Sequence, residues 1–149
     1  MFTVQQLMQE KGGEETFSVS PKATVYDALQ MMADKNTGAV MIVDDQGQMV
    51  GIFTERDYAR KVILKGKHSL ETPIEEIMTS ETVTVSLETS VQECMNLMSQ
   101  NHIRHLPVMK GGRLIGMVSM RDVVDVLLSR KDDTIWNLEN YILGTDYGK

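Results

Sequence analysis

The sequence has little that could staple or anchor a chain: one cysteine, three prolines, one tryptophan and no long apolar run. The lone Cys94 excludes an internal disulfide and fits a reducing compartment, so we expect a cytoplasmic protein. No run approaches the roughly 20 apolar residues of a membrane-spanning helix, and residues 1–11 lack the apolar centre of a signal peptide. We therefore expect no membrane partner.

Positive charge is also scarce. Fifteen Lys and Arg stand against 21 Asp and Glu, which gives a net charge of −6 over 149 residues. Because nucleic-acid binding relies on Lys and Arg neutralising phosphates, this balance argues against a nucleic-acid partner. A small anionic ligand is still allowed, since a few local cations are enough to bind it.

The chain consists of two similar halves. Three blocks recur in the same order, at offsets falling from 70 to 65 residues: 4–8 as 74–78, 24–29 as 90–95 and 51–57 as 116–122. The extra residues of the first half fall in predicted loops, where insertions are tolerated. We therefore predict repeat 1 at residues 2–64, a linker at 65–73, repeat 2 at 74–129 and a tail at 130–149.

Both repeats predict the same element order, β-α-β-β-α, preceded by a short helix. In repeat 1 the predicted elements are a helix at 4–9, a strand at 17–19, a helix opening at Thr24, strands at 39–43 and 49–53, and a helix at 55–64. Their counterparts are 74–79, 82–85, a helix opening at Ser90, 105–109, 114–118 and 120–128. The fold class is α/β of the α+β type: two repeats packed as one pseudo-two-fold module, with small mixed sheets and flanking helices.

The segments 51–57 and 116–122 read Gly-apolar-apolar-Thr/Ser-x-Arg-Asp. Thr or Ser followed three residues later by Asp is an ordinary helix cap, and that interpretation stays open. The same groups also suit a ligand, because a carboxylate accepts bonds from two adjacent hydroxyls and a helix N-terminus favours phosphate. Both segments place Arg directly before the Asp, which the caps at Thr24 and Ser90 do not.

These segments, the strand 104–108 (Arg-His-Leu-Pro-Val) and the repetition together resemble the CBS domain, the cystathionine-β-synthase-type repeat that occurs in tandem pairs. The resemblance runs from Phe2 to about Ser129. It implies clefts between the repeats that bind an adenosine nucleotide such as AMP, ADP or ATP as a regulatory ligand. NAD or S-adenosylmethionine is the alternative ligand.

The resemblance also implies that the Asp accepts ribose hydroxyls and that each cleft has walls from both repeats. The first cleft would contain Ile52, Thr54, Asp57, Thr82, Val83, Arg104 and His105. The second would contain Ser18, Val19, Gly38, Ala39, Met117, Ser119, Arg121 and Asp122. Since Arg104 and a protonated His105 can hold a phosphate, we expect the first cleft to prefer a phosphorylated ligand.

Three further features have plainer interpretations. His102 and His105 are three residues apart on a strand approach, where side chains diverge, so we expect no metal site. Cys94 lies on an apolar helical stripe and is expected in the core. In the tail, Ile135 and Leu138 fall at helical spacing, which predicts a final helix across the module or a partner chain.

The leading hypothesis is therefore a non-enzymatic regulatory module that signals occupancy to an unidentified regulated protein. The resemblance implies a homodimer. The alternative is an interaction module whose clefts stay empty, with Thr54 and Ser119 acting only as caps. An enzyme is least favoured, because no nucleophile with a base and an orienting group is visible.

Overall fold

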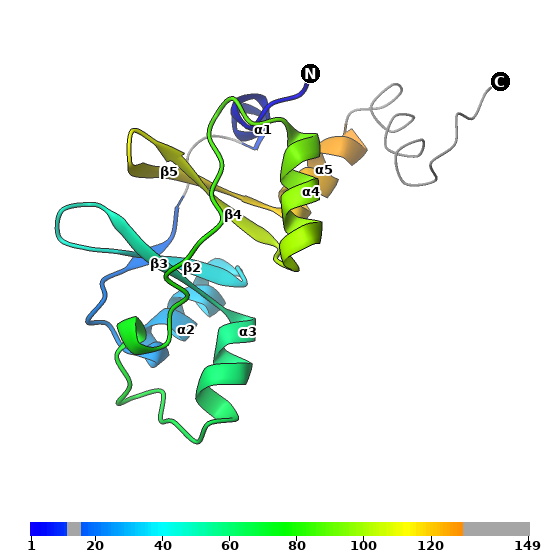
Figure 1. The fold of residues 1–149 in the computed structure, drawn as a ribbon. Coiled ribbons are helices and arrows are strands. Elements are labelled where there is room, and N and C mark those ends of the chain that lie inside the picture. The colour runs from blue at the N-terminus through cyan, green and yellow to red at the C-terminus, as the bar shows by residue number, and fades with distance from the viewer. Residues whose placement is uncertain (12–15, 130–149) are drawn as a thin grey trace.

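The computed structural model describes residues 1–11 and 16–129, so the predicted tail helix lies outside the described residues. Figure 1 shows two lobes, each a small sheet with helices packed on it. One lobe contains β1 (Ser18–Val19), α2 (Val25–Lys35), β2 (Ala39–Val43), β3 (Met49–Thr54) and α3 (Glu55–Asp57), which continues as a π-helix (Tyr58–Ile63). The other contains α1 (Val4–Glu10), α4 (Val91–Asn101), β4 (His105–Lys110), β5 (Arg113–Ser119) and α5 (Met120–Ser129). The α+β fold class is confirmed.

The two sheets differ in their first strand. In repeat 1, β1 pairs parallel to β2, and β2 pairs antiparallel to β3. In repeat 2 only β4 and β5 form a ladder, and the predicted strand at 82–85 is reduced to a single bridge from Val85 to Val108. Pro107 explains the loss: its counterpart Met41 donates its N–H to Phe17, and proline has no N–H to donate.

The helices begin where the sequence predicts. Thr24 and Asp27 form a reciprocal capping box on α2, whereas Ser90 caps α4 from one side only. Two other expectations were wrong in detail. The helix predicted at 74–79 is a single 3₁₀ turn (Ile74–Glu76), and the helix at 55–64 changes from α to π after its first turn.

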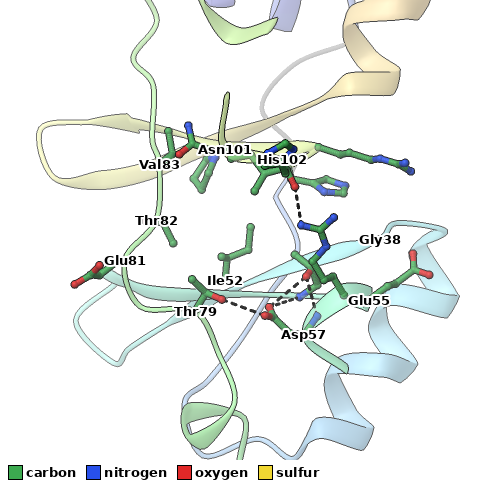
Figure 2. A pocket seen from close by; sticks show the side chains of 16 residues that line it. Gly38, Ile52, Glu55, Asp57, Thr79, Glu81, Thr82, Val83, Asn101 and His102 are labelled. Carbon is green, nitrogen blue, oxygen red and sulfur yellow. Dashed lines mark hydrogen bonds between the residues drawn. The ribbon is translucent and has the colours of Figure 1, made fainter. Parts of the chain in front are cut away.

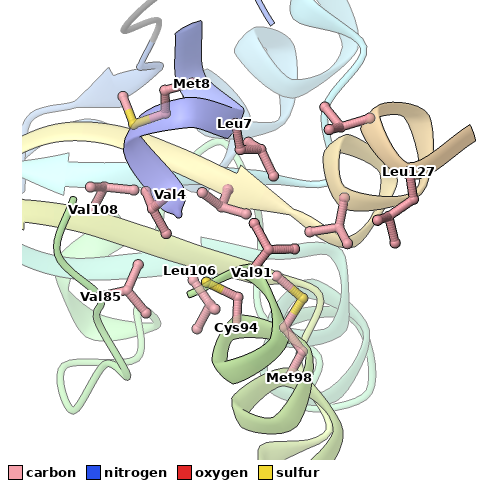
Figure 3. Packing of buried hydrophobic residues seen from close by; sticks show 13 residues of the cluster. Val4, Leu7, Met8, Val85, Val91, Cys94, Met98, Leu106, Val108 and Leu127 are labelled. Carbon is pink, nitrogen blue, oxygen red and sulfur yellow. The ribbon is translucent and has the colours of Figure 1, made fainter. Parts of the chain in front are cut away.

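Each repeat contributes its leading segment to the core of the other repeat. Val4 and Leu7 of α1 are fully buried among α4, β4 and α5 (Figure 3). Ile74 and Ile77, at the start of repeat 2, pack in the core of repeat 1. Backbone bonds fix both exchanges, because Val4 N–H donates to the Thr89 carbonyl at 2.8 Å and Ile74 N–H donates to that of Ala23 at 2.7 Å. Neither repeat, taken as a stretch of sequence, closes its own core.

A third apolar cluster joins the two sheets. Its buried members are Ala39, Met41, Ile52 and Met117. Cys94 lies in the core of the second lobe as expected, where burial first and Glu93 second raise its pKa to about 11. The thiol is therefore protonated and unreactive at neutral pH. No helix in residues 1–11 and 16–129 is long and apolar enough to cross a membrane.

Candidate functional site

A cleft of about 570 Å³ opens between the lobes, beside the start of α3. It is lined by all seven residues predicted for the first cleft: Ile52, Thr54, Asp57, Thr82, Val83, Arg104 and His105. They come from β3, α3, the segment before α4 and the start of β4 (Figure 2). A cavity of this size suits a small organic ligand.

The cleft also contains residues that the sequence reasoning did not assign to it. They are Gly38, Glu55, Arg56, Thr79, Glu81, Asn101, His102, Ile103 and Pro107. Glu55 and Arg56 lie inside the repeated motif, so their position could have drawn attention to them. Thr79 directly follows the block 74–78, and only its contacts in the folded chain reveal its role.

Asp57 is the most engaged polar group of the cleft and is only 7% exposed. Its Oδ2 accepts bonds from the N–H and the hydroxyl of Thr54, at 3.0 and 3.2 Å. Its Oδ1 accepts the Thr79 hydroxyl at 3.1 Å and lies 3.1 Å from Lys61 Nζ. A carboxylate has about four acceptor positions, so the chain itself fills them. A ligand hydroxyl would have to displace one of the two threonine hydroxyls from the carboxylate.

The motif therefore does act as a helix cap. Asp57 N–H donates to Thr54 Oγ1 at 3.2 Å, which completes a reciprocal capping box at the start of α3. This cap does not exclude a role in ligand binding, because the Asp57 carboxylate that forms it also lines the cleft.

Lys61, on the π-helix, links Asp57 to the first residues of repeat 2. Its Nζ donates to the Ile77 carbonyl and to Thr79 Oγ1, both at 3.2 Å. Since Lys61 occupies an acceptor position of the Thr79 hydroxyl, that hydroxyl is oriented to donate to Asp57. The ammonium therefore both neutralises the carboxylate and orders its partner.

Arg56 bridges the cleft between the repeats. Its Nη1 donates to the backbone carbonyl of His102 at 2.9 Å, the dashed line that spans the gap in Figure 2. His102 is the left-handed residue that ends α4, with φ 54°, and a cation is favourable at that end of a helix. In the part of the chain that the structure describes, no hydrogen bond or ion pair holds the exposed guanidinium of Arg104.

His105 corrects one expectation. Burial lowers its pKa from the ordinary 6.5, while Asp122 and Glu55 raise that pKa and Arg104 lowers it further. The imidazole is therefore neutral at neutral pH, where it can donate one N–H but adds no positive charge. The cations of this cleft are Arg56 and Arg104. Among the described residues no group of three or more His, Cys, Asp or Glu could hold a metal ion.

The residues predicted for the second cleft are not gathered in the same way. The cavity beside Asp122 is lined by Glu10, Lys11, Asp122, Asp125, Val126 and Ser129, so Asp122 alone of the eight predicted residues lines it. Gly38 lines the first cleft instead. Ala39 and Met117 are buried in the cluster between the sheets.

The other four predicted residues have separate surroundings. Ser18 is exposed on β1, and Val19 packs on the core of repeat 1. Ser119 caps α5, accepting the Asp122 N–H at 3.0 Å. Arg121 lies 3.9 Å from Asp125 on its own helix, rather than spanning to the other repeat as Arg56 does.

Lys11 is the main feature at Asp122 that the sequence did not reveal. Its Nζ donates to Asp122 Oδ2 at 2.8 Å and to the Met117 carbonyl at 2.9 Å. Both side chains are 22% exposed. The pair connects the end of α1 to the start of α5, residues 111 positions apart, so no local pattern could predict it.

Comparison with known proteins gives one consistent family. The CBS domain matches twice, at residues 4–64 and 74–129. The chain is 40% identical over 149 residues to the mitochondrial CBS domain-containing protein CBSX3 of Arabidopsis thaliana, covering 95% of this chain and 72% of that protein. It superposes on a protein with CBS domains from Burkholderia ambifaria MC40-6 with a TM-score of 0.82, at 42% identity, covering 89% and 98% of the two chains.

A third match is described as a hexameric CBS-CP12 protein from bloom-forming cyanobacteria. The TM-score is 0.72 at 28% identity, and the match covers 91% of this chain and 78% of that one.

Proposed function

Because this chain belongs to the CBS domain family, we propose that it is a regulatory module that binds an adenosine nucleotide in the first cleft and signals occupancy to a partner protein. The ligand class is AMP, ADP or ATP. The observation that carries the proposal is the convergence of seven residues from both repeats on one cavity of about 570 Å³. A ligand there contacts both lobes and so can favour one arrangement of them over another.

The chemistry of the walls suits the parts of a nucleotide. Ile52 and Val83 offer apolar surface to a base. Asp57 and Thr54 offer hydroxyl acceptors to a ribose, and Arg104 offers an unpaired guanidinium to a phosphate. We assign the ligand a regulatory and not a reactive role, so the protein would not be an enzyme.

A second candidate is an interaction module whose cleft stays empty. It is favoured by the filled acceptor positions of Asp57, since the carboxylate needs no ligand to satisfy it. In that case nucleotides leave the stability of the protein unchanged.

We further propose that the module self-associates as a homodimer in the cytoplasm. Exposed apolar side chains at the end of the π-helix and on α5 support the self-association: Ile63, Leu64, Val124 and Leu128. A homologous structure is described as hexameric, so light scattering should measure the mass of the assembly directly.

Thermal unfolding with adenosine, AMP, ADP, ATP, NAD, S-adenosylmethionine and GMP tests the proposal. Ligands stabilise what they bind by RT ln(1 + [L]/Kd), so an adenosine nucleotide should raise Tm and GMP should not. Arg104→Ala should reduce the shift with AMP and keep the shift with adenosine. Arg113→Ala, an exposed arginine outside the cleft, is the matched control. No shift with any adenosine ligand would favour the empty-cleft module.

A further inference from the structure

The first cleft contains a carboxylate that the proposed function leaves unexplained. Glu55, the first residue of α3, lies on the opposite side of Asp57 from Thr79 in Figure 2. Its position is permitted by Gly38, because a Cβ built there would lie 2.7 Å from Glu55 Oε1 and 3.4 Å from His105 Cε1. The carboxylate and the imidazole therefore meet over a residue that has no side chain.

The charge of Glu55 is not neutralised by a close partner. Within residues 1–11 and 16–129 no hydrogen bond or ion pair engages its carboxylate. Asp57, by contrast, has Lys61 at 3.1 Å. Because no close cation neutralises it, the negative charge of Glu55 acts on the charged groups of a ligand in the cleft.

Glu55 stands at the same end of the cleft as the unpaired cation. A Cβ built at Gly38 would lie 3.4 Å from the His105 ring and 2.7 Å from Glu55 Oε1, and Arg104 directly precedes His105 in the chain. Arg56, the other cation of the wall, already donates to the His102 carbonyl. The other carboxylate of the wall, Glu81, lies on the opposite side of the cleft from Glu55 (Figure 2). At the end where Arg104 lies, a cation opposed by Glu55 suits a phosphate of low charge and disfavours a chain of phosphates.

Repeat 2 carries neither half of this arrangement. The residue equivalent to Glu55 is Met120, and the residue equivalent to Gly38 is Arg104. The glycine and the glutamate therefore occur together in one repeat only, and they shape one cleft.

We propose that Glu55 limits the negative charge of the ligand, so that the first cleft takes an adenosine monophosphate in preference to di- and triphosphates. This inference rests on the proposed function. Each added phosphate brings negative charge to the end where Glu55 lies, and like charges at close range lower affinity by up to about tenfold per step in a partly solvated cleft.

Calorimetric titration with adenosine, AMP, ADP and ATP, without divalent cations, tests this selectivity. Glu55→Gln keeps the shape and removes the charge. The control is Glu88→Gln, an exposed glutamate outside the cleft that changes the net charge equally. We expect the wild type to bind AMP about tenfold or more tightly than ATP, and Glu55→Gln to reduce that ratio about fivefold. The affinity for adenosine, which has no phosphate, should change by less than about twofold.

The titration with adenosine distinguishes nucleotide binding in the cleft from the charge limit set by Glu55. If adenosine binds and Glu55→Gln leaves the ratio of the ATP and AMP dissociation constants unchanged, the charge limit is overturned and the nucleotide cleft is retained. Wild-type protein that binds ATP as tightly as AMP does the same. If neither protein binds any of the four ligands, both the proposed function and the charge limit are wrong. A ratio that also falls in Glu88→Gln would assign the effect to net charge and overturn the role of Glu55.

Discussion

The two Thr/Ser-x-Arg-Asp segments share a motif, but different parts of the chain hold them. In repeat 1, Thr79 donates its N–H to the Ile52 carbonyl at 2.8 Å and its hydroxyl to Asp57 at 3.1 Å. In repeat 2 the ammonium of Lys11 contacts the equivalent residues, donating to the Met117 carbonyl at 2.9 Å and to Asp122 Oδ2, which also accepts the Ser119 N–H, at 2.8 Å.

This difference follows from how the chain enters each lobe. At the start of repeat 2 a single 3₁₀ turn is followed by non-helical chain, so Thr79 can bridge β3 with its backbone. At the start of repeat 1 the helix α1 continues to Glu10, and the Lys11 N–H that follows it donates to the Leu7 carbonyl within the helix. A long side chain then has to supply the donor. The two repeats thus keep equivalent hydrogen-bond acceptors, a backbone carbonyl and a carboxylate, but supply them with different donors. The acceptors need some donor, and any donor that reaches them suffices.

The largest expected contrast is between Asp57→Ala and Asp122→Ala. Removing Asp57 takes away the acceptor for four donors in a buried place, so it should cost about 3 kcal/mol of unfolding free energy. Asp122 has a 22% exposed side chain that water can reach, and its loss should cost about 1.5 kcal/mol. Urea unfolding measures both. Equal costs would show that the extra partners of Asp57 add no stability.

A smaller contrast separates Gly51→Ala from Gly116→Ala. A Cβ at Gly51 would lie 2.6 Å from Met78 Sδ and 3.0 Å from the carbonyl oxygen of Thr79, which the bridge to β3 holds in place. A Cβ at Gly116 meets chiefly the flexible side chain of Met8. We expect costs of about 2 and about 1 kcal/mol in chemical denaturation. The reverse order would mean that the Thr79 backbone yields more easily than a methionine.

The smallest contrast concerns pH, because His105 has Ala39 as its counterpart in repeat 1. Burial holds the pKa of His105 below 6.5, so the unfolded chain binds this proton more readily. The neutral, buried His105 therefore makes its full contribution to the free energy of unfolding above pH 6.5. That contribution is lost as the pH falls below 6.5, because the unfolded chain then takes up the proton. We expect His105→Asn to flatten the fall in unfolding free energy between pH 7 and 5 by up to about 1 kcal/mol. A fall in unfolding free energy that is as steep in His105→Asn as in the wild type would contradict this role of His105.

The sequence predicted the parts of the fold that local patterns control. Thr24 and Ser90 open their helices as expected, and both predicted hairpins form. The strand at 82–85 failed because its outcome depended on Pro107, a partner more than twenty residues away whose missing N–H ends the ladder. Local propensity carries no information on such a partner.

The same division applies to the cleft. The family resemblance assigned seven residues to one cleft on the basis of sequence motifs, and all seven line the same cavity. Thr79 and Glu55, which line the cavity, and Lys61, which pairs with Asp57, were not assigned to the site, because their roles depend on which atoms lie opposite them after folding. The neutral state of His105 is likewise a consequence of burial, which no residue type reveals alone.

The sequence by itself determined that this protein has two equivalent units, each with a capped Asp at a strand-to-helix junction. Only the tertiary structure decided that the units exchange their leading segments and that one Asp is enclosed by Thr79 and Lys61 while the other meets Lys11. The physical reason is range. Caps and turns are satisfied within a few residues, whereas the partner of a buried charge is chosen by whatever the folded chain places within about 3 Å.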